Sequence, residues 1–172
     1  APINIYGSTL DEFRIFFPTY GINFDLVDDI NDLKQVEQLI KPDTKAIYVE
    51  SVANPSTEIA DLAALAQIAH KAGIPLIVDN TFPTPYLLRP FEHGADIVIY
   101  SSTKGINGHG NTLSGLVVDH GKFNWANGKF PQFTTEEFIL GDEEKKQTAS
   151  FSSKFGQKAF IKRIRMKYVR LL

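Results

Sequence analysis

The chain contains no cysteine, one methionine and one tryptophan among its 172 residues. Without cysteine it can form no disulfide, no thiolate nucleophile and no cysteine-based metal site. No apolar run approaches the roughly 20 residues of a membrane-spanning helix. Eighteen basic and 20 acidic side chains give a net charge of −2, so the overall charge indicates neither nucleic acid nor an acidic membrane surface as a partner. These absences favour a globular protein of the reducing cytoplasm.

The composition is that of a protein with a core, because 43% of the residues are hydrophobic and 22% are charged. The length suffices for one ordinary domain. The chain starts with Ala1 rather than methionine and stops inside an expected helix at Leu172. We therefore expect a piece of a longer protein.

Short apolar segments alternate with amphipathic ones along the first two thirds of the chain. Strands are expected at residues 22–27, 46–50, 74–78, 97–99 and 115–119, and helices at residues 9–17, 32–40 and 61–72. Ser8 or Thr9 is the expected N-cap of the first helix. This alternation predicts an α/β fold, with a mostly parallel sheet covered by helices on both faces.

The C-terminal third is less regular. Residues 123–141 are aromatic and loop-like, and from residue 145 onward nine basic residues occur without an acidic one. Such a run could be an RNA-binding arm. We favour one helix with a solvated basic face, because charge runs are mostly solvated surface. Its inward side chains would be Phe160, Ile161, Ile164 and Tyr168.

Polar side chains gather where the expected parallel strands end. Glu50 and Asn54 follow one strand, Asp79 ends the next, and Lys104 follows the third after Ser101. Because parallel strands bring their carboxyl ends to one edge of the sheet, these groups should meet there. A lysine, a carboxylate and hydroxyl donors suit pyridoxal 5'-phosphate, which needs an amine for a Schiff base and an acid beside its ring nitrogen.

Each of these residues also has a simpler interpretation. Asp79 could be a turn residue, Lys104 a surface lysine, and the hydroxyls of Ser101 and Thr103 could bond to loop backbone. His109 lies in a glycine-rich loop, with no second histidine or cysteine at ligand spacing, so no metal site is expected. The joint occurrence of the residues favours the cofactor.

Several motifs match one family in order and spacing. They are Tyr6-Gly-Ser-Thr9, Glu50-Ser-Val-Ala-Asn54-Pro55, Val78-Asp79-Asn80-Thr81 and Ser101-Ser-Thr-Lys104-Gly-Ile-Asn-Gly-His109. Together they resemble the Cys/Met-metabolism family of PLP-dependent enzymes, whose large domain has the PLP-dependent transferase fold of type I. The segment from Gly121 to Pro131 resembles the O-acetylhomoserine sulfhydrylase branch. Ser8 and Ser102 depart from the family, which often has glycine and alanine there.

The resemblance implies a role for each matched residue. Lys104, Asp79 and Tyr6 form the implied catalytic set: Lys104 holds the cofactor as a Schiff base and moves protons, Asp79 pairs with the ring nitrogen, and Tyr6 stacks on the ring. The remaining implied cofactor contacts are Ser101 and Thr103 to the phosphate, Asn54 near the phenolic oxygen or the substrate carboxylate, and Thr81 on the other ring face.

The implied reaction is a γ-replacement that converts O-acetyl-L-homoserine and sulfide, or a thiol, to L-homocysteine and acetate in methionine and cysteine biosynthesis. Cystathionine γ-synthase, cystathionine γ-lyase and methionine γ-lyase share the same residues and stay open as alternatives. An inactive truncated fragment or an interaction domain is the alternative of another class. The resemblance implies a homotetramer, built as a dimer of dimers.

Residues 1–172 would be part of the large PLP-binding domain, with an N-terminal segment and a C-terminal small domain outside the chain. In the family, the strand that ends near Tyr6 lies between the strands of Phe24 and Ile47. We therefore expect a gap in the sheet at that place, and a chain that is not a competent enzyme alone.

Overall fold

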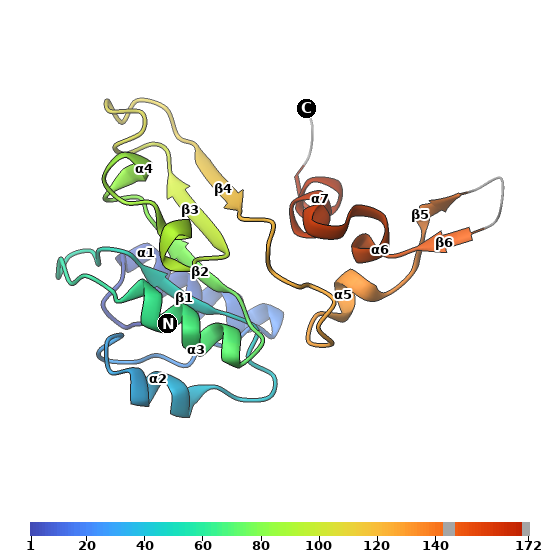
Figure 1. Cartoon of the computed structure of the whole chain (residues 1–172). Helices are drawn as coiled ribbons and strands as arrows, with labels where there is room; N and C mark the ends of the chain where they lie inside the picture. The colour runs from blue at the N-terminus through green and yellow to red at the C-terminus, as the bar shows by residue number, and fades with distance from the viewer. Residues whose placement is uncertain (143–146, 170–172) are drawn as a thin grey trace. The chain divides into compact units, whose positions relative to one another are not determined.

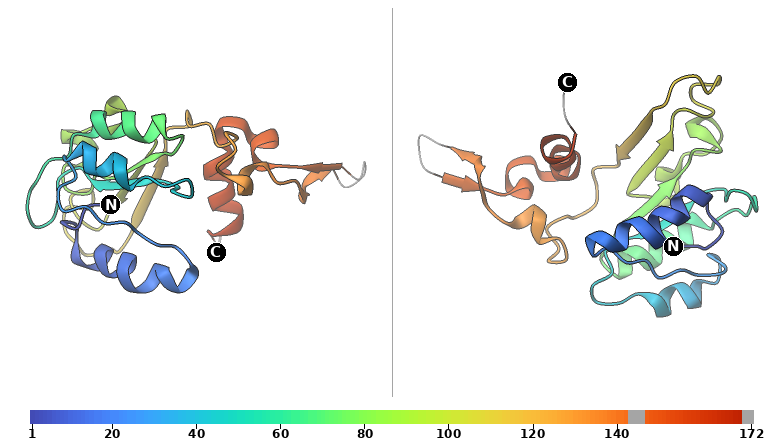
Figure 2. Two further views of the ribbon diagram at one scale, coloured as in Figure 1. Left: turned by 90° about the horizontal axis from the view of Figure 1, so that it is seen from below. Right: turned by 180° about the vertical axis from the view of Figure 1, so that it is seen from behind.

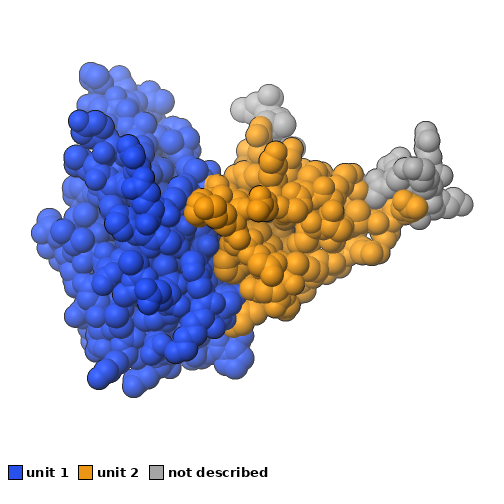
Figure 3. Space-filling model, viewed as in Figure 1, with its two compact units in different colours: residues 1–118 blue, residues 119–172 orange. Residues whose placement is uncertain are grey.

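The computed structural model describes residues 1–142 and 147–169. The chain divides into two compact units, residues 1–118 and residues 119–172 (Figure 3). Each unit has its own core, so each is described by itself.

A four-stranded sheet forms the centre of the first unit (Figure 1). Its strands, in the order in which they lie side by side, are β1 (Ile47–Glu50), β2 (Leu76–Asp79), β3 (Ile97–Ser101) and β4 (Gly115–Asp119). β1, β2 and β3 are parallel, with Glu50 opposite Asp79 and Asp79 opposite Ile99. β4 runs in the opposite direction (Figure 1). The prediction of a mostly parallel sheet is thus confirmed.

Helix α3 (Leu62–Lys71) covers one face of this sheet, and the helical run that follows Tyr6 lies on the other (Figures 1 and 2). The helix begins where the Asp61 carboxylate accepts a hydrogen bond from the Ala64 amide at 3.0 Å. Its apolar stripe is buried, with Leu65 and Ala69 fully inaccessible. The chain leaves through Gly73 at φ +68°, a left-handed conformation that glycine adopts without steric cost.

The first helical run consists of three continuous pieces, α1 (Gly7–Asp11), a π-helical turn η1 (Glu12–Phe16) and a 3₁₀ turn η2 (Phe17–Tyr20). Tyr6 is its N-cap residue and contributes no side-chain cap. The expected N-cap at Ser8 or Thr9 is therefore wrong, and both residues lie inside the helical run. The run extends beyond the expected end at residue 17, and Gly21, at φ +74°, ends it.

The remaining helices of the first unit are short. Asp32 caps α2 (Leu33–Leu39), which matches the helix expected at residues 32–40, by accepting from the Gln35 amide at 3.1 Å. Proline-rich sequence after β2 forms only α4 (Thr84–Leu87) and the 3₁₀ turn η3 (Pro90–His93). These turns carry the chain from β2 back to the start of β3.

Residues 22–27 do not form the expected strand. Val27 makes an isolated parallel bridge to Pro2, through hydrogen bonds with Ala1 and Ile3 only. A cavity of about 740 Å³ lies beside this segment, and its lining includes Phe24, Val27, Ile47 and Tyr48. The segment has too few backbone partners to form a ladder, although its alternating pattern is typical of a strand.

The second unit has more regular structure than expected. Its elements are α5 (Pro131–Thr134), β5 (Glu137–Asp142), β6 (Gln147–Ala149), α6 (Phe151–Phe155), η4 (Gly156–Lys158) and α7 (Ala159–Lys167). β5 and β6 form an antiparallel pair. The prediction that residues 123–141 are a loop is wrong for α5 and β5. The expected single helix is also wrong, because Gly156 at φ +51° separates α6 from α7.

Aromatic rings form the core of the second unit. Trp125 stacks on Phe160 with ring centroids 4.8 Å apart and contacts Phe133 at 4.7 Å. Phe160 thus packs inward as expected, whereas Tyr168 is 72% exposed and does not. Trp125 is 5% exposed, which explains why a segment without helical or strand periodicity still orders around it.

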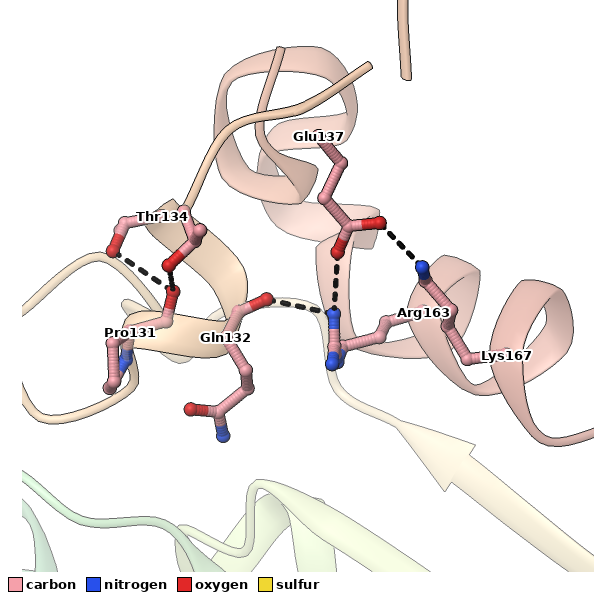
Figure 4. A network of polar contacts seen from close by, with 7 residues as sticks. Pro131, Gln132, Thr134, Glu137, Arg163 and Lys167 are labelled. Carbon is pink, nitrogen blue, oxygen red and sulfur yellow. Dashed lines mark hydrogen bonds and ion pairs between the residues drawn. The ribbon is translucent and has the colours of Figure 1, made fainter. Parts of the chain in front are cut away.

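Some basic side chains of the C-terminal helices are paired within the unit. Glu137 of β5 contacts both Arg163 and Lys167 of α7, and Arg163 also donates to the Gln132 carbonyl (Figure 4). The basic face is therefore partly neutralised rather than wholly solvated. Lys145, Lys146 and Arg170 of the basic run lie outside the described residues.

Among the described residues, no helix has both the length and the apolar character needed to cross a bilayer. Across residues 1–142 and 147–169, no group of three or more histidine, cysteine, aspartate or glutamate side chains is arranged to hold a metal ion.

Candidate active site

Three strands end at one edge of the sheet with polar residues. Glu50, Asp79 and Ser101 are the last residues of β1, β2 and β3. Glu50 and Asp79 are register partners, and Asp79 is paired with Ile99, two residues before Ser101. The expected meeting of these groups at the carboxyl edge is thus present in the structure.

Asp79 is held from two sides. Its Oδ1 accepts a hydrogen bond from the Thr81 amide at 2.9 Å, and its Oδ2 lies 3.5 Å from the Tyr48 hydroxyl, at the long limit of a hydrogen bond. Tyr48 packs edge-on against Phe13, with ring centroids 4.9 Å apart. Burial, and then the negative charge of Asp79, raise the pKa of Tyr48, so its hydroxyl stays protonated and can donate to the carboxylate.

Thr81 links the ends of β2 and β3. Its hydroxyl oxygen accepts a hydrogen bond from the Ser101 amide at 2.8 Å. The link fixes Ser101, and with it the start of the turn that carries Lys104, relative to Asp79. Among the described residues, the Ser101 hydroxyl has no hydrogen-bond partner of its own, so it can bind a ligand.

Lys104 lies on a tight turn that follows β3. Its amide donates to the Ser101 carbonyl at 3.1 Å, and its carbonyl accepts from the Gly108 amide at 2.9 Å. The side chain is exposed, and in the described part of the chain its amine has no ion-pair or hydrogen-bond partner. A Cβ on Gly105 would come within 2.8 Å of the Thr84 methyl group, so a larger residue at that position would require Thr84 or the turn to shift.

The hydroxyls that flank Lys104 differ in their surroundings. The Thr103 hydroxyl donates to the Ser114 carbonyl at 3.3 Å and accepts from the Ser114 amide at 3.0 Å, so it already joins the turn to the start of β4. Ser102 is 9% exposed, and its hydroxyl has no partner among the described residues. Among the described residues of this turn, Ser101 therefore carries the hydroxyl that is both unpartnered and partly exposed, whereas the unpartnered Ser102 hydroxyl is buried.

Tyr6 and Asn54 come from separate segments and are joined by Glu50. One carboxylate oxygen of Glu50 accepts from the Tyr6 amide and the other from the Asn54 amide, both at 2.9 Å. Glu50 is 7% exposed, whereas Tyr6 is 47% exposed. Burial raises the pKa of Glu50; the two amide hydrogen bonds lower it and the charge of Asp79 adds to the increase.

The sequence placed Glu50 at this edge without a part in the cofactor site, and it indicated no role for Tyr48 or Asn80. Glu50 and Tyr48 are described above. Asn80 is fully buried; its amide group donates to the carbonyls of Thr84 and Leu88, and its oxygen accepts from the Ser51 hydroxyl at 2.8 Å. For Glu50 and Asn80, the available signal was their position at or directly after the ends of adjacent buried strands, where a polar residue needs a partner.

The chain matches one family model over residues 1–155, that of the Cys/Met metabolism PLP-dependent enzymes. A homocysteine synthase of Schizosaccharomyces pombe is 47% identical over 135 residues, which cover 75% of this chain and 30% of that protein. An O-acetyl-L-homoserine sulfhydrylase of Leptospira meyeri is 42% identical over 134 residues, which cover 78% of this chain and 30% of that protein. The chain thus spans about a third of the length of these relatives.

Two solved structures resemble the chain over nearly its whole length. An O-acetylhomoserine (thiol)-lyase of Campylobacter jejuni, which contains a pyridoxyl-lysine phosphate group, matches with a TM-score of 0.83 and 30% identity over 97% of this chain and 40% of that one. An O-acetylhomoserine sulfhydrylase of Wolinella succinogenes matches with a TM-score of 0.78 and 32% identity over 96% of this chain and 42% of that one. The chain therefore belongs to the family of Cys/Met-metabolism PLP-dependent enzymes.

Proposed function

We propose that this chain supplies the lysine-bearing part of a PLP-dependent enzyme that converts O-acetyl-L-homoserine and sulfide to L-homocysteine and acetate, a thiol in place of sulfide giving the S-substituted homocysteine. The observation that carries the proposal is the position of Lys104, whose exposed amine follows β3 at the sheet edge where Asp79 ends β2. The similarity to sulfhydrylases and homocysteine synthases supports this choice of reaction within the family.

The residues at the edge fit pyridoxal 5'-phosphate. Lys104 offers an amine without a partner among the described residues, as a covalent bond to an aldehyde requires. The Ser101 hydroxyl is a donor for a phosphate oxygen, whereas Thr103 must release Ser114 before it can donate. Asp79 offers an acceptor that Thr81 holds in place.

The bound cofactor would supply an electron sink for the negative charge that develops when a proton leaves the substrate. Asp79 would hold a proton on the ring nitrogen, which keeps that sink effective. Lys104 would bind the cofactor covalently and, once the substrate amine has displaced it, accept the Cα proton. The exposed ring of Tyr6 would pack on the face of the cofactor, with Asn54 and Thr81 as further contacts.

The overall exchange takes place at Cγ of the substrate. The Cγ–O bond breaks and acetate leaves with the electron pair, and the sulfur of sulfide forms the new Cγ–S bond. The protons that are removed from the substrate carbons return before homocysteine leaves, so Lys104 must both accept and donate protons.

The chain would act as part of a larger assembly. We propose that residues 1–172 belong to the large cofactor-binding domain of a cytoplasmic protein, and that this protein forms a homotetramer built as a dimer of dimers. Because the chain spans about a third of its relatives, we expect it to be inactive without the remaining polypeptide. Light scattering of the natural-length protein tests the assembly.

Product analysis tests the reaction. The natural-length protein is loaded with pyridoxal phosphate and given O-acetyl-L-homoserine and sulfide, with Lys104→Ala as the control. Homocysteine and acetate in equal amounts, absent from the control, are the expected result. Release of an oxo acid and a thiol from methionine, without homocysteine formation, would instead identify a γ-lyase.

A further inference from the structure

We propose that Glu50 is a positioning residue that sets the two polypeptide segments flanking the cofactor ring, and that its ionised carboxylate acts through Tyr6 and Asn54. The proposal rests on the proposed function, because it assigns Glu50 to the same cofactor site. Its carboxylate accepts one backbone N–H from each segment, both at 2.9 Å.

The two segments have no shared strand to align them. Tyr6 lies at the start of the first helical run, and Asn54 lies in the loop after β1, 48 positions later in the sequence. Within the described residues, the Tyr6 amide and the Asn54 amide each donate a hydrogen bond to the Glu50 carboxylate. Glu50 therefore sets both backbones relative to the end of β1.

A buried carboxylate is an unfavourable choice for a merely structural contact. Glu50 is 7% exposed, and the loss of solvation and the nearby charge of Asp79 both raise its pKa. The two charge-assisted hydrogen bonds from the amides offset part of the free-energy cost of burying the ionised carboxylate. A neutral amide could not replace the Glu50 carboxylate. Glutamine has one acceptor oxygen and would turn its NH₂ group toward the second N–H donor.

The register of β1 and β2 places the Glu50 carboxylate beside the expected cofactor site. Glu50 is the direct partner of Asp79, the expected acid beside the ring nitrogen. Tyr6 and Asn54 are the expected contacts of the ring face and the ring substituents. A shift of either segment would change contacts to the ring while leaving the β1–β2 pairing intact.

The affinity of the natural-length apoprotein for pyridoxal phosphate tests the proposal. Glu50→Gln should weaken binding about tenfold and shift the absorption maximum of the bound cofactor, because one charge-assisted hydrogen bond is lost. Glu92→Gln is the matched control, because Glu92 is 65% exposed and pairs only with the exposed Arg89 in the described chain; it should bind like the parent. If Glu50→Gln does not fold, Glu50→Asp serves instead, since it keeps the charge but is too short to reach both amides.

A double-mutant cycle separates positioning from general destabilisation. Glu50→Gln is combined with Tyr6→Ala and Asn54→Ala, which remove the side chains through which Glu50 would act. The loss of affinity from Glu50→Gln should disappear in that background. An equal loss with and without the two side chains, or no loss in the parent, would overturn the proposal. Failure of the parent itself to bind the cofactor through Lys104 would overturn the proposed function as well.

Discussion

Glu50 and Asp79 lie opposite each other at the carboxyl ends of two adjacent parallel strands, each with both carboxylate oxygens in contact with a donor. Glu50 binds two backbone amides, whereas Asp79 is held by one amide and a tyrosine hydroxyl. The pair gives the sheet edge two carboxylates with different partners. We propose that Glu50 aligns the backbone and that Asp79 pairs with the ring nitrogen of the cofactor.

Replacement of Asp79 by asparagine should lower γ-replacement activity by about 10² or more, because a neutral amide cannot hold a proton on the ring nitrogen. Steady-state kinetics of the natural-length protein measure the change. Asp43→Asn, an exposed substitution in the first unit, should leave the rate unaltered. A rate within twofold of the parent for Asp79→Asn would remove Asp79 from the mechanism.

The raised pKa of Glu50 predicts a specific pH dependence of stability. The native state holds the Glu50 proton up to a higher pH than the unfolded chain, so its contribution to stability is largest below the pKa of glutamate in the unfolded chain. The contribution falls as pH rises through the window up to the raised native pKa. Urea denaturation at a series of pH values should show the parent losing stability relative to Glu50→Gln across this window. A gain in the stability of the parent relative to Glu50→Gln as the pH rises would contradict the prediction.

Gly105 is expected to be replaceable only together with its neighbour. Gly105→Ala places a methyl group 2.8 Å from the Thr84 methyl and should move the Lys104 turn, which would lower cofactor affinity by about tenfold to a hundredfold. Thr84→Ser removes that methyl group and should restore most of the affinity in the double variant. Thr84→Ser alone is the control. If the double variant binds the cofactor no better than Gly105→Ala, the clash with Thr84 is not the cause of the lost affinity.

Asn80 should matter for stability. Asn80→Ala leaves the Ser51 hydroxyl and two carbonyls without their buried partner, and we expect a loss of about 2–4 kcal/mol in the free energy of unfolding. Asn23→Ala, at an exposed asparagine of the same unit, should change it by less than about 0.5 kcal/mol. Denaturant titrations compare the two, and equal small effects would show that the buried network contributes little.

The sheet and its polar edge could be predicted because they depend on local patterns. Buried β-branched runs and the Asp61 cap specify β1 to β3 and α3 without long-range information. The contacts that hold the edge were harder to predict, because Glu50 reaches the Tyr6 amide and Asn80 reaches the Ser51 hydroxyl only when distant segments meet. Nothing near Tyr6 in the sequence indicates that its amide bonds to Glu50.

The structure also differs from the sequence prediction where contacts between distant residues decide the local structure. Residues 22–27 have a strand pattern but too few backbone partners. The second unit orders around stacked rings of Trp125 and Phe160, a contact for which periodicity gives no signal. Thr103 carries the hydroxyl expected for the phosphate, yet it bonds to Ser114, a residue 11 positions away.

Trapping of the bound cofactor tests the central claim most directly. The natural-length protein is incubated with pyridoxal 5'-phosphate, reduced with borohydride, digested and analysed by mass spectrometry. We predict one phosphopyridoxyl group per chain, on Lys104, and none on that peptide in Lys104→Ala. A label spread over other lysines, or an unlabelled Lys104, would contradict the account.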